Sequence, residues 1–170
     1  MELSGSGGGP LGPDVRVPTF FGIAIAFADH LSAADVLPAR AAELDAGRAA
    51  AELFADLDPG LAGRVDRGAV LVAGHRLGHG SGGAASARAL AAAGFVAVVA
   101  ASFADGFDEH CLAAGLPPVE VDAPAMFHTG QRVRMNWEAG TIANLSSGDR
   151  QAIRNATEAM LARLRAAVGR

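Results

Sequence analysis

Short apolar runs alternate along the chain with segments of helical spacing, and glycine-rich or polar stretches separate them. The run FFGIAIAF is almost continuously apolar, which is typical of a strand covered on both faces. AVLVA and FVAVVAA repeat this pattern further along, and a shorter run follows them. The predicted strands of this first part are residues 20–27, 69–73, 95–101 and 119–121.

Segments with helical spacing lie between these strands. Residues 41–57 place apolar side chains among charges at helical intervals. An alanine-rich helix is predicted over residues 84–93, where Gly94 ends it, and another over residues 103–114, where Gly115 ends it. Strands that alternate with helices in this way predict a parallel sheet built from β/α units.

The pattern changes in the last third of the chain. Residues 130–137 and 141–145 have the composition of two strands, and the turn at 138–140 joins them into an antiparallel hairpin. A closing amphipathic helix is predicted over residues 150–168, with its apolar side chains on one side. The sequence therefore predicts the α/β class, a single domain with a mostly parallel core sheet plus an antiparallel hairpin.

The first 17 residues differ from the rest. Residues 1–17 are rich in Gly, Ser and Pro and poor in apolar side chains, so we expect a flexible leader there. The folded domain is then expected over residues 18–170. A chain of 170 residues fits one domain, and its 51% hydrophobic residues suffice for a sizeable core, although only 5% are aromatic.

Charge and cysteine content exclude several classes of function. The net charge is −4 and the arginines are scattered, so no basic stripe is available for nucleic acid. The single cysteine, Cys111, cannot form a cysteine-clamped zinc or iron–sulfur site on this chain alone. No apolar run approaches the ~18 residues that span a membrane, and no signal peptide is apparent. We therefore expect a cytoplasmic protein.

A glycine-dense loop, Gly74-His-Arg-Leu-Gly-His-Gly-Ser-Gly-Gly83, carries the candidate chemistry. It lies between a predicted strand and a predicted helix, where free backbone N–H groups and the helix dipole favour anions. Ser81 is the one side chain of residues 80–83 that can take part in proton chemistry, although it could also serve as a helix N-cap. His75 and His79 stand four residues apart, but the glycine between them argues against a helical metal pair, so no metal site is predicted.

The glycine spacing also matches a dinucleotide-binding fingerprint. Gly78, Gly80 and Gly83 fit the pattern, and Asp105 follows at roughly the distance of a ribose-binding acid. The fingerprint should begin directly after the strand, yet four residues intervene here. Too little chain remains for the second half of a doubly wound sheet, so dinucleotide binding is disfavoured.

Three motifs, taken together, resemble a known family. The stretch Gly74-His-Arg-Leu-Gly-His-Gly-Ser-Gly-Gly-Ala-Ala-Ser86 has the spacing of a loop that reads G-x-N-F-G-C-G-S-S-R-E-H-A. Ala100-Ala-Ser-Phe-Ala-Asp-Gly-Phe107 with Gly115-Leu-Pro117 matches a second motif, and Gly130-Gln-Arg-Val-Arg-Met135 with Gly140-Thr-Ile-Ala-Asn-Leu-Ser-Ser-Gly148 a third. The order and spacing are similar to the small subunit of 3-isopropylmalate dehydratase, which has the swivelling β/β/α domain of the aconitase superfamily.

The resemblance implies roles for single residues. It places the base that moves the substrate α-proton at Ser81. Gly82 takes the place of a second serine, Gly83 that of the arginine that holds a substrate carboxylate, and His79 that of a cysteine. Asp29 and Arg40 retain family residues of an earlier loop. The residues expected to line the substrate site are His79, Gly80, Gly82, Gly83, Arg76, Asp29 and Arg40.

Three functions remain open at this point. The first is a hydro-lyase small subunit that isomerises a 2-hydroxy diacid together with a large subunit. That partner would carry the [4Fe–4S] cluster, and this chain would hold no cofactor. The second is a stand-alone cyclase or isomerase of specialised metabolism that acts on a less polar small molecule, because Gly and Ala replace the carboxylate-holding groups. A stand-alone protein of this kind would have a homo-oligomer, rather than a large subunit, as its assembly. The third is a non-catalytic binding subunit.

Overall fold

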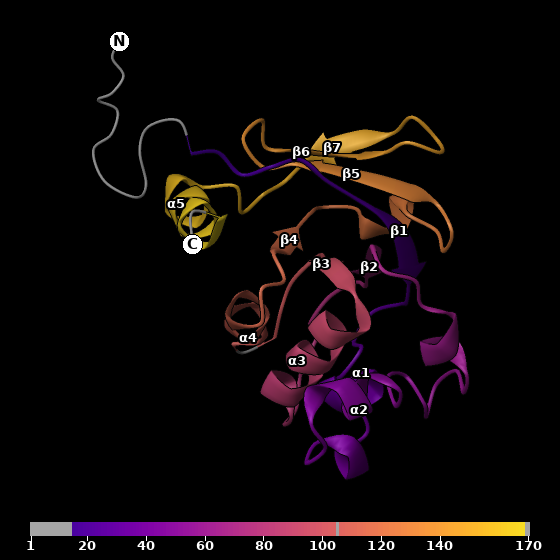
Figure 1. Ribbon diagram of the computed structural model, residues 1–170. Coiled ribbons are helices and arrows are strands. Elements are labelled where there is room, and N and C mark those ends of the chain that lie inside the picture. The colour runs from indigo at the N-terminus through magenta and orange to yellow at the C-terminus, as the bar shows by residue number, and fades with distance from the viewer. Residues whose placement is uncertain (1–14, 105, 169–170) are drawn as a thin grey trace.

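The computed structural model describes residues 15–104 and 106–168 (Figure 1). Seven strands form one sheet in the order β4-β3-β2-β1-β5-β6-β7. The strands are β1 (Phe20–Ala26), β2 (Ala69–Val72), β3 (Phe95–Ala100), β4 (Pro118–Glu120), β5 (Arg132–Asn136), β6 (Thr141–Asn144) and β7 (Arg150–Ala152). The α-helices are α1 (Ala33–Val36), α2 (Ala46–Ala50), α3 (Gly83–Ala93), α4 (Phe107–Ala113) and α5 (Glu158–Val168), and short 3₁₀ turns cover Ala39–Ala41, Leu61–Arg64 and Pro124–Met126.

One half of the sheet is parallel. β1 pairs with β2, β2 with β3, and β3 with β4, all in parallel. Figure 1 shows α1, α2 and α3 grouped on one side of these strands. Residues from these helices and from α4 form a core with one face of the parallel strands, where Leu71, Leu90 and Val98 are fully buried.

The other half is antiparallel. β1 also pairs with β5, and β5, β6 and β7 continue the sheet in antiparallel fashion. The second core lies on the opposite face of the sheet and includes Trp137, Met135 and Ile142 together with Leu161 and Leu164 of α5. The predicted fold class is confirmed, and the hairpin predicted at residues 130–145 is part of the same sheet as the parallel strands.

Several predicted boundaries are wrong, each for a tertiary reason. Residues 41–57 do not form one helix: Asp45 caps the five-residue α2, turns follow, and Phe54 has a positive φ of 59°. The predicted helix over 150–168 loses its first part because β7 pairs with β6 there, so α5 begins at Glu158. The helix predicted from residue 103 starts at Phe107, because Phe103 and Ala104 pair with Leu77 of the glycine-rich loop instead.

The first strand is not covered on both faces as predicted. Phe21 and Ile23 are 59% and 44% exposed, because the helices cover the parallel half of the sheet and end short of this part of β1. Among the described residues, no helix is long and apolar enough to cross a membrane.

Residues 1–14 of the predicted leader lie outside the described residues. The structure shortens the predicted leader, because Val17 is already buried in the second core. Its backbone N–H donates a hydrogen bond to Glu138 Oε2 at 2.8 Å. Glu138 also accepts from Arg165 Nε of α5 at 3.0 Å, so one carboxylate joins the start of the folded chain, the β5–β6 turn and the last helix.

This contact predicts a loss of stability in acid. Hydrogen bonds from Arg165, and then from the Val17 N–H, lower the pKa of Glu138 from 4.5 to about 2. A carboxyl whose pKa is lower in the folded state stabilises the protein above its unfolded-state pKa, and this contribution disappears as the pH falls through the folded-state value. The melting temperature followed by circular dichroism should therefore fall between pH 4.5 and pH 2, and it should fall less steeply in Glu138→Gln. The same change at exposed Glu43 is the control, and an identical acid response in Glu138→Gln would contradict the prediction.

Candidate functional site

The glycine-rich loop lies at the carboxyl ends of the parallel strands and is held by backbone hydrogen bonds on both sides. On one side Gly78 N donates to Leu31 O at 2.7 Å, and Ala33 N donates to His79 O at 2.8 Å. On the other side Leu77 N donates to Ser102 O at 3.1 Å. Isolated β-bridges outside the seven strands join His79 to Ser32 and Leu77 to Phe103. The carboxyl end of an open parallel sheet is where ligands bind in α/β folds.

Two close approaches fix which loop positions must be glycine. Gly78 has φ +85°, and a Cβ built there would lie 2.2 Å from the ring of Phe107. A Cβ on Gly74 would lie 1.7 Å from Asp29 Oδ1. Gly80 and Gly82 also have positive φ, but a Cβ on either would meet nothing within 4 Å. Gly74 and Gly78 are therefore needed for close packing, whereas Gly80 and Gly82 are needed only for their positive φ.

Ser81 is exposed on this loop, two residues before α3 begins at Gly83. The N-cap of α3 is Gly82, with φ +93° and no side-chain capping bond, so the structure contradicts the alternative that Ser81 caps the helix. The Ser81 hydroxyl is accessible instead, beside the first turn of an eleven-residue helix. Backbone N–H groups of such a turn favour a negative charge on a neighbouring group.

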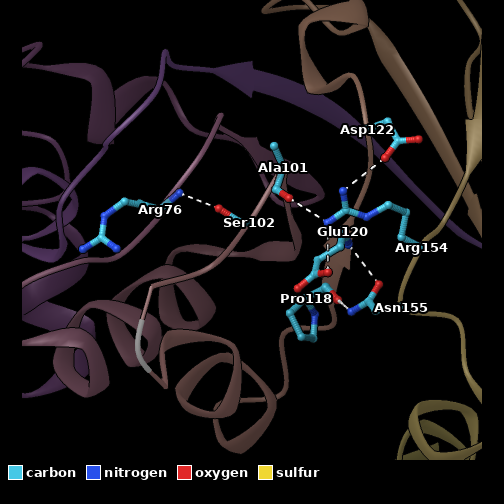
Figure 2. A network of polar contacts seen from close by, with 8 residues as sticks. All are labelled: Arg76, Ala101, Ser102, Pro118, Glu120, Asp122, Arg154 and Asn155. Carbon is cyan, nitrogen blue, oxygen red and sulfur yellow. Dashed lines mark hydrogen bonds and ion pairs between the residues drawn. The ribbon is translucent and has the colours of Figure 1, made fainter.

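The side chain of His79 is fixed by a hydrogen bond, whereas Arg76 is fixed only through its backbone. His79 Nε2 lies 2.9 Å from the carbonyl oxygen of His30; because a carbonyl only accepts, Nε2 is the protonated nitrogen and donates this bond. Arg76 has a positive φ of 60°, and its backbone N–H donates to Ser102 Oγ at 2.9 Å. Figure 2 shows the Arg76 guanidinium extending away from Ser102, and the side chain is exposed.

Asp29 is joined to the start of the loop, at His75. Its Oδ1 accepts a hydrogen bond from the His75 backbone N–H at 2.7 Å and lies 3.3 Å from His75 Nδ1. These bonds, the backbone one first, lower the pKa of Asp29, so the group is a carboxylate at neutral pH. Asp29 and His75 lie on the rim of a groove of about 390 Å³. The remaining lining is mainly apolar and comes from residues 26–28, 72–74, 122–125 and 127.

Arg154 follows β7 and meets the end of β4 next to this groove. Figure 2 shows its guanidinium among three oxygen acceptors: Asp122 at 3.1 Å, Glu120 at 3.2 Å and the carbonyl of Ala101 at 2.9 Å. Asn155 fixes the same strand by accepting from Glu120 N and donating to Pro118 O. Two carboxylates thus neutralise Arg154. Arg154 is not among the predicted site residues, because nothing near position 154 in the sequence indicates that the segment after β7 contacts β4.

The structure does not bring all predicted site residues together. Ser81, His79, Arg76 and Gly80–Gly83 share the loop and the start of α3, and Asp29 is tied to its base. Arg40 is engaged elsewhere: its guanidinium lies 3.1 Å from Asp56 and 3.9 Å from Glu52. Among the described contacts, none joins Arg40 to the loop.

The side chains of this chain do not fit an iron–sulfur cluster. Cys111 is fully buried in α4, and burial raises the pKa of its thiol far above the usual range. In residues 15–104 and 106–168, no group of three His, Cys, Asp or Glu side chains could hold a metal ion. Asp105, considered above as a ribose ligand, lies outside the described residues.

Comparisons with known proteins agree with this geometry. Residues 63–124 match the family model described as "Aconitase C-terminal domain". The 3-isopropylmalate dehydratase small subunit of Moorella thermoacetica is 38% identical over 125 residues, covering 72% of this chain and 75% of that one. The corresponding protein of Pyrobaculum neutrophilum is 34% identical over 131 residues, covering 76% and 80%. The crystal structure of a 3-isopropylmalate dehydratase from Methanocaldococcus jannaschii superposes with a TM-score of 0.74 at 25% identity, over 78% of this chain and 80% of that one.

The sheet order, the loop at its carboxyl edge and the matched family model together define an aconitase-type swivelling domain. Within that class, the chain belongs to the family of 3-isopropylmalate dehydratase small subunits.

Proposed function

We propose that this protein is the small subunit of a hydro-lyase that acts on a 2-hydroxy acid together with a separate large subunit. One observation carries the proposal: Ser81 stands exposed on a loop that backbone hydrogen bonds fix at the carboxyl edge of the sheet, beside the uncapped first turn of α3. Relatives named as small subunits support the need for a partner. The [4Fe–4S] cluster that the resemblance implies would be held by that partner.

In this function, Ser81 would exchange the substrate α-proton. The N–H groups at the start of α3 would stabilise the deprotonated form and the negative charge of a nearby carboxylate. His79, Gly80 and Gly82 would border the substrate, and Arg76 would be the guanidinium on the loop that is free to meet a carboxylate. With glycine at position 83, the chain offers no second arginine there, so we expect a substrate with less charge than a dicarboxylate.

The proposal is tested by mixing the purified chain with the large subunit of a 3-isopropylmalate dehydratase. Hydration and dehydration of 2-hydroxy acids should appear only in the mixture and should saturate at one small subunit per large subunit. Ser81→Ala should lower kcat about a hundredfold, at the lower end of the general-base range. It should leave association measured by calorimetry unchanged.

Ser147→Ala is the matched control, because Ser147 is an exposed serine on the β6–β7 loop. Full activity of Ser81→Ala in the mixture would refute the role of Ser81. Association without any turnover would favour the non-catalytic binding subunit.

A second function is favoured by the groove beside Asp29. Its lining is mainly apolar, and its rim carries the carboxylates of Asp29 and Asp122, which disfavour a dicarboxylate. A stand-alone cyclase or isomerase for a less polar molecule would use such a groove. Turnover by the isolated chain would support this second function over the first.

A further inference from the structure

His75 belongs to the glycine-rich loop, lines the groove and has no part in the two-subunit function proposed above. We propose that the groove at the carboxyl ends of β1 and β2 binds an uncharged carbonyl compound, and that His75, positioned by Asp29, removes and returns a proton next to the carbonyl group. This assignment goes beyond the proposed two-subunit function, because every residue that it uses belongs to this chain.

The first support is the orientation of the imidazole. Asp29 Oδ1 lies 3.3 Å from Nδ1 of His75 and 2.7 Å from the backbone nitrogen of the same residue. A carboxylate only accepts hydrogen bonds, so the neutral ring that donates from Nδ1 leaves Nε2 with a free lone pair. A carboxylate that holds one ring nitrogen in this way sets the tautomer and stabilises the imidazolium that forms when Nε2 takes a proton.

The second support is the backbone around this pair, which requires a glycine at position 74 and a positive φ at position 30. Asp29 reaches the loop because position 74 has no side chain, since a Cβ there would lie 1.7 Å from Oδ1 and 2.8 Å from Cγ of the carboxylate. His30, the next residue, has a positive φ of 61°, which is uncommon for a residue with a side chain, and its N–H donates to the His75 carbonyl at 2.8 Å. The loop bearing Asp29 and the loop bearing His75 are therefore fixed to each other at three points.

The third support is the chemistry of the groove. Its volume of about 390 Å³ is that of a small-molecule site, and Phe27, Val72, Ala73 and Phe127 are among the apolar residues that line it. Among the described residues no arginine lines it, and the neighbouring Arg154 is neutralised by Glu120 and Asp122. An apolar site with carboxylates at its rim disfavours anionic ligands and accepts an uncharged one.

The proton transfer needs no further reactant. Nε2 takes a proton from the carbon next to the carbonyl group, and the electron pair of that C–H bond moves to form an enolate. The imidazolium then returns a proton, either to the same carbon or to the oxygen. The net result is exchange with solvent or isomerisation, and the protein ends in its starting state.

The experiment measures exchange of the α-protons of cyclohexanone for deuterium in D2O by NMR, with the isolated full-length chain. The wild type should accelerate exchange at least tenfold over buffer and show saturation with ketone. His75→Gln should return the rate to that of buffer. Asp29→Asn should lower the saturated rate about tenfold while the ketone concentration for half-maximal rate stays within twofold, which separates a positioning role from a loss of the groove.

His110→Gln is the matched control, because His110 is an exposed histidine of α4 and should leave exchange unchanged. Cyclohexane-1,2-dicarboxylate, a dianion with the same ring, should not compete with the ketone. Exchange no faster than buffer in the wild type, or full exchange in His75→Gln, would overturn the proposal. Because the assay contains no large subunit, either result leaves the two-subunit function to be judged by its own test.

Discussion

Gly83→Arg should raise kcat/KM for 3-isopropylmalate by a hundredfold or more when the chain is assayed with a compatible large subunit. Bidentate arginine–carboxylate pairs are strong and geometrically specific, and each charged hydrogen bond contributes roughly 1.5–3 kcal/mol. Because ~1.4 kcal/mol is a tenfold factor in rate, two such bonds account for the expected gain. The measurement is steady-state turnover of 3-isopropylmalate by wild type and variant at equal subunit ratio.

The structure can accommodate this substitution. Gly83 is the first residue of α3, and its φ lies outside the left-handed region, unlike that of Gly82. A Cβ at position 83 would meet His110 Cδ2 at 3.0 Å and Phe107 Cδ1 at 3.3 Å. His110 is exposed, so its ring can move by the few tenths of an ångström required.

Gly83→Gln is the control for this gain. Glutamine removes the glycine from the helix and extends a side chain in the same direction, but it carries no charge. Only arginine should restore turnover of the dicarboxylate. If the wild type already turns over 3-isopropylmalate as fast as Gly83→Arg, then Arg76 holds the carboxylate instead, and the expectation of a less charged substrate is wrong.

Gly78→Ala should destabilise the fold by roughly 2–5 kcal/mol. A residue with a side chain in the left-handed region costs about 1–2 kcal/mol, and forcing an extra methyl group into a packed core costs about 1–3 kcal/mol more. The methyl group would lie 2.2–2.6 Å from three ring atoms of Phe107, which is 1% exposed. The measurement is the free energy of unfolding from urea denaturation, followed by circular dichroism.

Gly80→Ala separates these two contributions. Gly80 has the same φ of +85°, but a Cβ there meets no other atom within 4 Å. Its substitution should therefore cost only the conformational part, about 1–2 kcal/mol. Equal losses in Gly78→Ala and Gly80→Ala would mean that the Phe107 ring moves aside without cost, and that the packing of α4 against the loop is looser than the structure indicates.

The substitutions at Gly83 and Gly78 test two different properties of the loop. Gly83 concerns what the loop can bind, whereas Gly78 concerns how the loop is held against α4. If Gly78→Ala remains folded but loses activity in the two-subunit assay, the position of the loop rather than global stability limits turnover.

The sequence by itself determined the elements with strong local signals. The continuous apolar runs of β2 and β3 predicted buried parallel strands, because strands covered on both faces are typically apolar at nearly every position. Gly94 predicted the end of α3, where the chain takes φ +102°. The glycine spacing of residues 74–83, together with two further motifs, predicted the swivelling domain and placed Ser81 on its loop.

Only the tertiary structure decided which side chains meet. β7 occupies the first residues of the predicted closing helix, because pairing with β6 supplies backbone hydrogen bonds that local helical spacing does not reveal. Arg40 pairs with Asp56 and Glu52, although its sequence context indicated the substrate site. Asp29 and His75 are 46 residues apart in sequence, and they meet because β1 and β2 are parallel neighbours whose carboxyl ends coincide. Contacts of this kind depend on strand order, and strand order is set by how the whole chain packs rather than by any local pattern.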